Sequence, residues 1–263
     1  MPLPSQPLIL TGGCSCGAIR YRIAVPESSS RPPVPFFPDG HDPMPNPVSC
    51  HCNDCRRATA SLLPVIFLQC PAPMVTVSVL EESPDEQGNG QQQHGGRFVD
   101  VLAEGYDQVA TDAKRPPYLP AVDVLRASST STSTGTQDNA AKKTWLRFYH
   151  STSCSPTASR TFCGRCGTQV AFHMALEPWH CTSGKLPDSF SDIIDINGGT
   201  FDRDVLDQEG WLDPGVEVNF RSGTALGKKV AASAKGMGHV PKMYGFVAAE
   251  GVATKEELER LAQ

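Results

Sequence analysis

The chain has 263 residues, of which 39% are hydrophobic, and carries a formal net charge of −5 at pH 7. This length suffices for one large domain or two small ones with a buried core. The sequence has no block of basic residues and no apolar run near the roughly 20 residues that span a bilayer, so we expect neither a nucleic-acid nor a membrane partner. The N-terminal segment lacks the basic and apolar regions of a secretory signal, which favours a cytoplasmic protein.

Several strands are predicted along the chain, and residues 19–23 and 145–151 show the alternation of apolar and polar residues, with a period of two, that marks a half-buried strand. Residues 8–25 predict two strands around a tight turn, and later strands are expected at residues 62–70, 74–80, 145–151, 162–174, 191–201 and 216–222. Thr254 and Glu257 form a capping box, which predicts a short C-terminal helix. These elements together indicate a mostly β protein.

Proline-rich, polar and Ser/Thr-rich stretches interrupt the predicted strands and are expected to be loops. We predict a single domain over residues 1–263, with long loop insertions at 26–47, 81–143 and 175–190 and an extension at 223–263. The core of this domain is expected in four blocks, which are residues 8–25, 48–80, 144–174 and 191–222.

The ten cysteines are the strongest chemical signal in the sequence. In a reducing compartment cysteines indicate metal ligands or catalytic thiols rather than disulfides. Cys70, Cys154 and Cys181 stand alone. The other seven have metal-ligand spacings: Cys14 and Cys16, then Cys50, Cys52 and Cys55, then Cys163 and Cys166.

The number seven fits one closed zinc site of four thiolates and one open site of three. Structural zinc takes four ligands, whereas catalytic zinc keeps three protein ligands and one exchangeable position. The C-x-x-C turn at Cys163 and Cys166 needs a second pair, which Cys14 and Cys16 can supply. Spacing alone also allows a zinc ribbon in which Cys52 and Cys55 join that C-x-x-C turn. An iron–sulfur cluster is the least favoured interpretation of these thiolates.

Three sequence blocks resemble the glutathione-dependent formaldehyde-activating enzyme family, which includes centromere protein V. The blocks are residues 13–21 (GCSCGAIRY), 50–57 (CHCNDCRR) and 162–168 (FCGRCGT), in the order in which the family has them. Residues 198–202 (GGTFD) are similar to a later segment of the family. The resemblance covers about 120 residues in scattered blocks.

The resemblance implies a β-tent fold of small antiparallel sheets and a carbon–sulfur lyase activity on glutathione adducts of formaldehyde. It implies two zinc ions. The structural zinc would be held by Cys14, Cys16, Cys163 and Cys166, and the catalytic zinc by Cys50, Cys52 and Cys55. Glutathione would be the cosubstrate. A homodimer is compatible with the sequence.

Four residues near the cysteine motifs are candidates for catalysis. Arg56 and Arg57 follow the open triad and are expected either to offset its negative charge or to bind a glutathione carboxylate, unless they are simply solvated. His51 lies between two ligands and is a candidate proton donor to an oxyanion. His173 ends a predicted strand beside the C-x-x-C turn and is a candidate base.

The long insertions depart from the family pattern and leave two other functions open. The open zinc could act as a Lewis acid on a larger carbonyl or epoxide metabolite in a biosynthetic pathway. Alternatively, both zinc ions are structural and the chain is a non-catalytic binding module. A fourth protein ligand at the triad, from His51, His173 or Cys181, would favour the binding module. A large apolar cavity over the triad would favour the larger metabolite.

Overall fold

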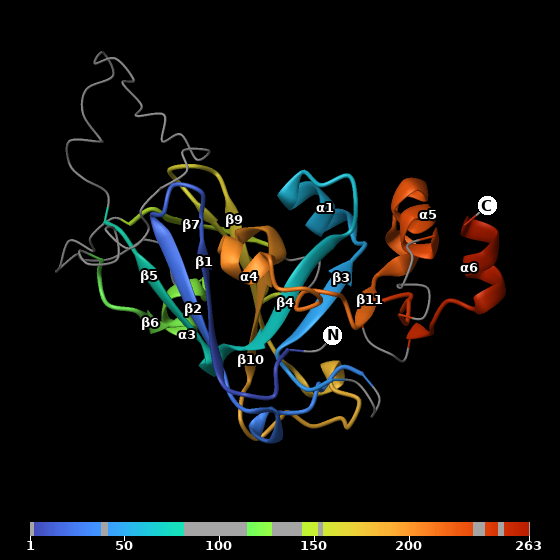
Figure 1. Cartoon of the computed structure of the whole chain (residues 1–263), viewed down its shortest axis with the longest axis horizontal. Helices are drawn as coiled ribbons and strands as arrows, with labels where there is room; N and C mark the ends of the chain where they lie inside the picture. Colours follow the sequence, from blue (N-terminus) through green and yellow to red (C-terminus); the bar gives the residue numbers. More distant parts are fainter. Residues whose placement is uncertain are drawn as a thin grey trace, which may run out of the picture.

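The computed structural model describes residues 3–37, 42–81, 115–127, 144–151, 155–233, 240–246 and 250–262, and these residues form two β-sheets (Figure 1). A four-stranded sheet has the order β1-β2-β5-β6, and a seven-stranded sheet has the order β11-β3-β4-β10-β9-β8-β7. The mostly β architecture predicted from the sequence is confirmed. The second sheet is larger than expected, and its edge strand β11 runs parallel to β3, whereas the other described pairings are antiparallel.

Most strands lie in the predicted blocks, but those at residues 46–50 and 159–163 are not among the predicted strands, and the one at 119–120 lies in the predicted 81–143 insertion; the helices are short. The smaller sheet consists of β1 (Leu8–Gly13), β2 (Ile19–Val25), β5 (Val75–Val79) and β6 (Leu119–Pro120). The larger sheet consists of β3 (Asn46–Cys50), β4 (Val65–Pro71), β7 (Leu146–His150), β8 (Ser159–Cys163), β9 (Gln169–Ala175), β10 (Asp192–Asn197) and β11 (Val216–Val218). The α-helices are α1 (Asn53–Thr59), α3 (Ala121–Leu125), α4 (Arg203–Leu206), α5 (Ala225–Ser233) and α6 (Lys255–Ala262).

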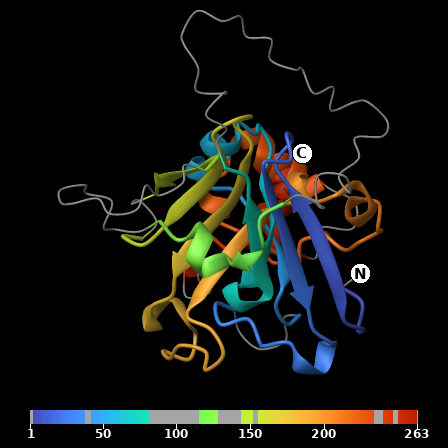
Figure 2. The same ribbon diagram turned by 90° about the vertical axis from the view of Figure 1, so that its left-hand side faces the viewer.

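The main hydrophobic core lies between the two sheets. Side chains alternate across a strand, so Ile194 and Ile196 of β10 point to the same face. They pack in one cluster with Ile19 and Tyr21 of β2 and Leu68 of β4. The smaller sheet therefore shields this face of the larger sheet from solvent. Figure 2 shows the smaller sheet beside it.

The opposite face of the larger sheet is covered by segments that the sequence predicted as insertion and extension. Phe36 and Met44, from the 26–47 insertion, are fully buried. They pack in one cluster with Val48 of β3 and with Met243, which belongs to the C-terminal extension. The described part of this insertion contains a short 3-10 turn (Ser28–Ser30) and the first residues of β3, and its apolar side chains make it part of the core. The candidate site lies on this second face.

A partly buried ion pair connects the hairpin of β1 and β2 to the segment that follows β10. Arg20 donates two hydrogen bonds to the carboxylate of Asp202, and Nη1 lies 2.6 Å from Oδ1. Gly12 lets the two segments approach, because a Cβ at this position would lie 2.2 Å from the Tyr21 hydroxyl and 2.4 Å from the Thr200 carbonyl oxygen. The GGTFD segment thereby holds the turn with Cys14 in place.

Several predicted boundaries differ from the structure. Strand β11 has three residues where seven were expected, because Asn219 adopts a left-handed conformation with φ of 56° and ends it. Helix α5 was not predicted. Much of the 81–143 insertion, together with Cys154, lies outside the described residues, although residues 115–127 add β6 and α3. Among the described helices, none has the length and apolar character needed to cross a membrane.

Candidate metal centres and adjoining cavity

The first cysteine cluster joins two turns that are distant in sequence. Cys14 and Cys16 lie between β1 and β2, Cys163 ends β8, and Cys166 lies in the turn between β8 and β9; their four sulfurs are within 4.8 Å of one another. Each turn continues through a glycine in the left-handed region, with φ of 72° at Gly17 and 76° at Gly167. Glycine adopts this conformation without steric cost, which lets both turns curl around a common point.

The sulfur spacing of this cluster fits a tetrahedral zinc ion. The Sγ atom of Cys16 lies 3.6 Å from the Sγ of Cys14 and 3.6 Å from that of Cys163. Zinc–sulfur bonds of about 2.3 Å in a tetrahedron place the sulfurs about 3.8 Å apart. The backbone N–H groups of Ile19 and Arg165 point to the sulfurs of Cys14 and Cys163, at 3.2 and 3.4 Å. Such donors stabilise thiolate ligands. The zinc-ribbon pairing that the spacing also allowed is therefore not the arrangement in the structure.

The second cluster forms where β3 ends and α1 begins. The sulfurs of Cys50, Cys52 and Cys55 lie within 4.8 Å of one another. Cys52 is the N-cap of α1, and its sulfur accepts a hydrogen bond of 3.2 Å from the backbone N–H of Cys55. A helix N-terminus carries partial positive charge, which favours a thiolate at this position. One short loop thus directs three sulfurs to one point.

The three thiols cannot all ionise without a compensating charge. Contact with Cys52 and Cys55, together with burial, raises the pKa of the Cys50 thiol well above its usual range. Contact with Cys50 and Cys55 lowers the pKa of Cys52, whose thiolate accepts their protons in hydrogen bonds. The cluster thus contains one thiolate beside two thiols that resist ionisation. A divalent cation bound there would allow all three to ionise. The residues therefore fit a soft metal ion such as zinc.

No fourth metal ligand joins this triad from the described part of the chain. The two clusters contain all described cysteine, histidine and carboxylate groups that gather in metal-binding geometry, and the second has three members. His51 lies within the loop, but its Nε2 atom is 2.6 Å from the Glu217 carboxylate. Cys181 lies in the 175–190 segment, and its sulfur is 4.0 Å from the Glu177 carbonyl oxygen. A fourth coordination position would therefore be left to an exogenous ligand.

His51 belongs to a buried charge network instead of the cavity. Its partner Glu217, on β11, also accepts an ion pair of 3.0 Å from Lys242, whose side chain is fully buried. Burial opposes ionisation of Glu217, but the hydrogen bonds from His51 and Lys242 outweigh it and lower its pKa. The ring of His51 packs edge-on against Phe220, with centroids 5.0 Å apart. The network fixes the C-terminal extension to the triad loop, and His51 does not line the cavity described below.

The Lys242→Met variant is expected to lower the free energy of unfolding by roughly 3–5 kcal/mol, because it leaves the Glu217 carboxylate buried without its cation. Adding Glu217→Gln to Lys242→Met removes that charge and should restore part of the loss. Urea unfolding of both variants measures the effect. A loss below about 1 kcal/mol in the single variant would show that the ion pair does not hold the extension in place.

The other catalytic candidates also lie outside the cavity. His173 points to the opposite face of β9 from the triad, where it is fully buried and its Nε2 lies 2.7 Å from Asp192. This placement corrects the expected role of His173, because alternation along the strand directs Phe172 and Met174, not His173, toward the site. Arg56 and Arg57 follow on α1, but neither lines the cavity; the Nε of Arg56 lies 3.4 Å from the Asn53 side chain.

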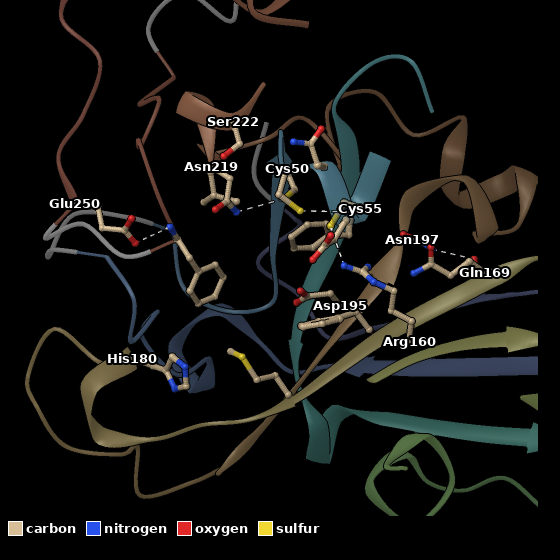
Figure 3. A pocket seen from close by; sticks show the side chains of 18 of the residues that line it. Cys50, Cys55, Arg160, Gln169, His180, Asp195, Asn197, Asn219, Ser222 and Glu250 are labelled. Atoms are coloured by element: carbon tan, nitrogen blue, oxygen red, sulfur yellow. Dashed lines mark hydrogen bonds between the residues drawn. The ribbon is translucent and has the colours of Figure 1, made fainter. Parts of the chain in front are cut away.

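The triad lies at a cavity of about 450 Å³ on the second face of the larger sheet. Figure 3 shows Cys50 and Cys55 bordering this cavity together with Arg160, Asp195 and Asn219. Its apolar lining includes Phe67, Phe172, Met174, Trp179 and Phe246. Trp179 comes from the 175–190 segment and Phe246 from the C-terminal extension, so these two segments build two of the walls.

Two cavity residues that the sequence did not single out donate hydrogen bonds to the triad. Arg160 of β8 lies 3.6 Å from the Cys55 sulfur through Nη2, and Asn219 lies 3.5 Å from the Cys50 sulfur through Nδ2. Arg160 is 4% exposed and stands over the Phe172 ring at 5.1 Å. It supplies the positive charge expected from Arg56 or Arg57. In a strand, neighbouring side chains point to opposite faces. Ser159 and Thr161 face the core, so Arg160 between them points to the cavity side.

Comparisons with known proteins do not identify the chain. No protein-family model matches it. No curated protein gives a significant match. The likeness to the formaldehyde-activating family therefore rests on the three motif blocks and on the cysteine clusters that they form.

Proposed function

We propose that the chain is a zinc-dependent enzyme of the carbon–sulfur lyase type, related to the glutathione-dependent formaldehyde-activating family and built on its β-tent fold. Its reaction would join a thiol such as glutathione to a small electrophile such as formaldehyde, or separate them. The observation that carries the proposal is the three-thiol cluster at a cavity, without a fourth ligand from the described residues. A purely structural site would have no need of the cavity or of an open position.

The two proposed zinc sites have different tasks. Zinc held by the four-cysteine cluster would fasten the β1–β2 hairpin to the β8–β9 hairpin. Zinc held by Cys50, Cys52 and Cys55 would lower the pKa of an incoming thiol and keep it as a thiolate near neutral pH.

The residues around the triad support thiol binding. Three thiolates make the site electron-rich, and the donors from Arg160 and Asn219 withdraw part of that charge. The apolar part of the lining lowers the local polarity around the triad, which would strengthen these electrostatic contacts. The 450 Å³ cavity lies within the 300–1,000 Å³ range of small-molecule sites and exceeds the needs of formaldehyde alone.

Metal content and thiol binding provide the first test of the proposed function. Purified protein should contain two zinc ions per chain, and the Cys52→Ser variant should contain one and remain folded. In protein with cobalt at the triad, glutathione should change the visible absorption spectrum, because a sulfur ligand joins the metal. Cys181→Ala is the matched control and should match the wild type in zinc content and in its response to glutathione. Two zinc ions without any response to thiols would instead support the non-catalytic binding module.

A second candidate function keeps the site and changes the substrate to a larger carbonyl or epoxide. The apolar walls from Trp179 and Phe246 favour it, since formaldehyde offers no surface for them to contact. Benzaldehyde and styrene oxide serve as probes. Saturation-transfer NMR should detect their binding to the zinc-loaded protein, and Trp179→Ala should weaken it at least threefold. Formaldehyde exchange without binding of either probe would rule this candidate out.

A further inference from the structure

Asp195 is an acidic residue between two isoleucines in the middle of strand β10. Its neighbours Ile194 and Ile196 point into the core between the sheets, so Asp195 points to the opposite face, where it lines the cavity of the triad. The residue is 6% exposed. Aspartate is almost never buried to this degree without a charged or hydrogen-bonded partner, because burial of a carboxylate is costly.

The groups opposite Asp195 on the neighbouring strands do not neutralise it. It pairs across the sheet with Gln69 of β4 and with Phe172 of β9, one a neutral amide and the other a hydrocarbon ring. Its Oδ1 atom is buried and makes no hydrogen bond of good geometry to a described residue, although the Gln69 amide lies close enough to favour the ionised carboxylate. Arg160 attracts Asp195 electrostatically, but its guanidinium also lies over Phe172 and donates to Cys55. Asp195 therefore presents a buried hydrogen-bond acceptor to any ligand in the cavity.

Asp195 and the triad border the same space. Figure 3 shows the Asp195 side chain below Cys50 and Cys55, with Arg160 beside it, while His180 and Glu250 lie on the other side of the view. A ligand whose sulfur is held at the triad would place the neighbouring carbon and its oxygen in the space between these walls. An oxygen that is removed from solvent there needs a polar partner.

We infer that Asp195 is a catalytic acid and base that exchanges a proton with the substrate oxygen. The inference rests on the proposed function. In the synthetic direction the thiolate attacks the carbonyl carbon, the carbon–sulfur bond forms, and the carbon–oxygen π pair moves to oxygen. The Asp195 carboxyl gives its proton to that oxygen and becomes a carboxylate. The thiol proton released on binding restores the acid through solvent, so the reaction consumes no net proton.

The environment of Asp195 suits both the donation of a proton by its carboxyl group and the removal of a proton by its carboxylate. Burial raises its pKa to about 7, although Gln69 and Arg160 favour the ionised form. General acids and bases are most effective when their pKa lies near the working pH. In the reverse direction the carboxylate removes the hydroxyl proton as the carbon–sulfur bond breaks.

The other titratable groups of the cavity are less suited to this role. His180 accepts a 2.8 Å hydrogen bond from the Glu177 backbone through Nδ1, and its ring stacks on Trp179. Glu250 accepts a hydrogen bond from the backbone N–H of Phe246 and is exposed. Asp54 lies on α1 and is half-buried. Asp195 alone among them combines burial with an oxygen that makes no hydrogen bond of good geometry to a described residue.

The test compares Asp195→Asn with the wild type by two readouts that separate chemistry from binding. Exchange NMR of ¹³C-formaldehyde with glutathione measures the rate of adduct formation and breakdown above the uncatalysed rate. The absorption spectrum of protein with cobalt at the triad measures glutathione binding. Asparagine preserves shape and removes the acid, so exchange should fall at least about 100-fold, while the dissociation constant of glutathione should change less than threefold. Asp188→Asn, an exposed carboxylate outside the cavity, is the control and should match the wild type.

The outcomes distinguish the inference from the proposed function. Exchange by Asp195→Asn at a rate within threefold of the wild type, with glutathione bound normally, would overturn the role of Asp195 and leave the proposed function standing. A wild type that neither binds glutathione nor accelerates exchange would overturn the proposed function, and the role of Asp195 with it. Loss of exchange together with intact thiol binding supports both.

Discussion

The Cys166→Ser variant is expected to hold one zinc ion per chain instead of two and to lose more than about 4 kcal/mol of unfolding free energy. Cys166 is the exposed member of the four-cysteine cluster. Substitutions at exposed positions usually change stability by less than about 0.5 kcal/mol, and larger effects require a specific mechanism such as loss of a metal. A large effect at this position therefore reports the proposed zinc ion rather than packing.

The size of the expected effect follows from what the cluster connects. Structural zinc sites contribute an apparent binding free energy of roughly 10–16 kcal/mol at pH 7, comparable to the whole stability of a typical domain. The ion would join two hairpins whose cysteines are 147 residues apart at the Cys16–Cys163 contact. Urea unfolding and elemental analysis provide the measurement. Cys181→Ala, which removes a buried thiol outside both clusters, should retain two ions and lose about 1 kcal/mol. Two zinc ions and unchanged stability in Cys166→Ser would refute the closed site.

The two cysteine clusters could be predicted because their determinants are mostly local. The spacing within 50–57 and 162–168 constrains the sulfurs to one turn each, whatever the rest of the fold does. The pairing of Cys14 and Cys16 with Cys163 and Cys166 was one of two arrangements that the spacing allowed, and the structure has it.

The cavity could not be predicted, because it depends on the register between distant strands. Arg160 reaches Cys55 because β8, β9, β10 and β4 place Arg160, Phe172, Asp195 and Gln69 in one row across the sheet. A shift of one residue in any of these pairings would turn the side chains to the other face. One feature of the sequence does point to the cavity, namely Asp195 between two isoleucines in residues 192–197 (DIIDIN).

The missed helix α5 has a different cause. Its residues 225–233 (ALGKKVAAS) are small or basic and show little apolar periodicity, so its packing, including buried Gly227 and Ala231, is decided by tertiary context. His51 was assigned to catalysis because it lies between two ligands. Its actual partner, Glu217, is 166 residues away, and nothing local to the motif indicates it.

The Asp195→Asn variant is expected to stabilise the protein at pH 8 and to do so less at pH 5. Burial raises the pKa of Asp195 from 3.8 to about 7. A group whose pKa is raised on folding contributes its full stability below the unfolded pKa and loses it as the pH rises through the folded pKa. The loss therefore occurs between about pH 4 and pH 7, where the unfolded chain has released the proton and the folded protein still holds it. Above pH 7 the Asp195 carboxyl is ionised in both states, so the stability lost by burying it no longer changes with pH.

The magnitude of this effect makes the measurement decisive. The full shift corresponds to roughly 4 kcal/mol, at 1.36 kcal/mol per pKa unit, and the part between pH 5 and pH 7 to roughly 3 kcal/mol. The gain from Asp195→Asn, measured by urea unfolding, should therefore be about 3 kcal/mol larger at pH 8 than at pH 5. The other charged or titratable groups around the cavity are present in both proteins: Cys50, Cys52, Asp54, Cys55, Arg160, His180 and Glu250. Their contributions largely cancel in the comparison.

The same substitution thus has opposite consequences for stability and for the proposed chemistry. Replacement of Asp195 by asparagine should strengthen the fold at neutral pH and, if the carboxyl exchanges the substrate proton, remove the activity. Replacement of a residue that only supported the fold would lower stability and activity together. Asp188→Asn should show a change of less than about 0.5 kcal/mol at either pH. A gain from Asp195→Asn that is the same at pH 5 and pH 8 would mean that the carboxyl titrates normally, and it would remove the physical reason for holding an acid in this cavity.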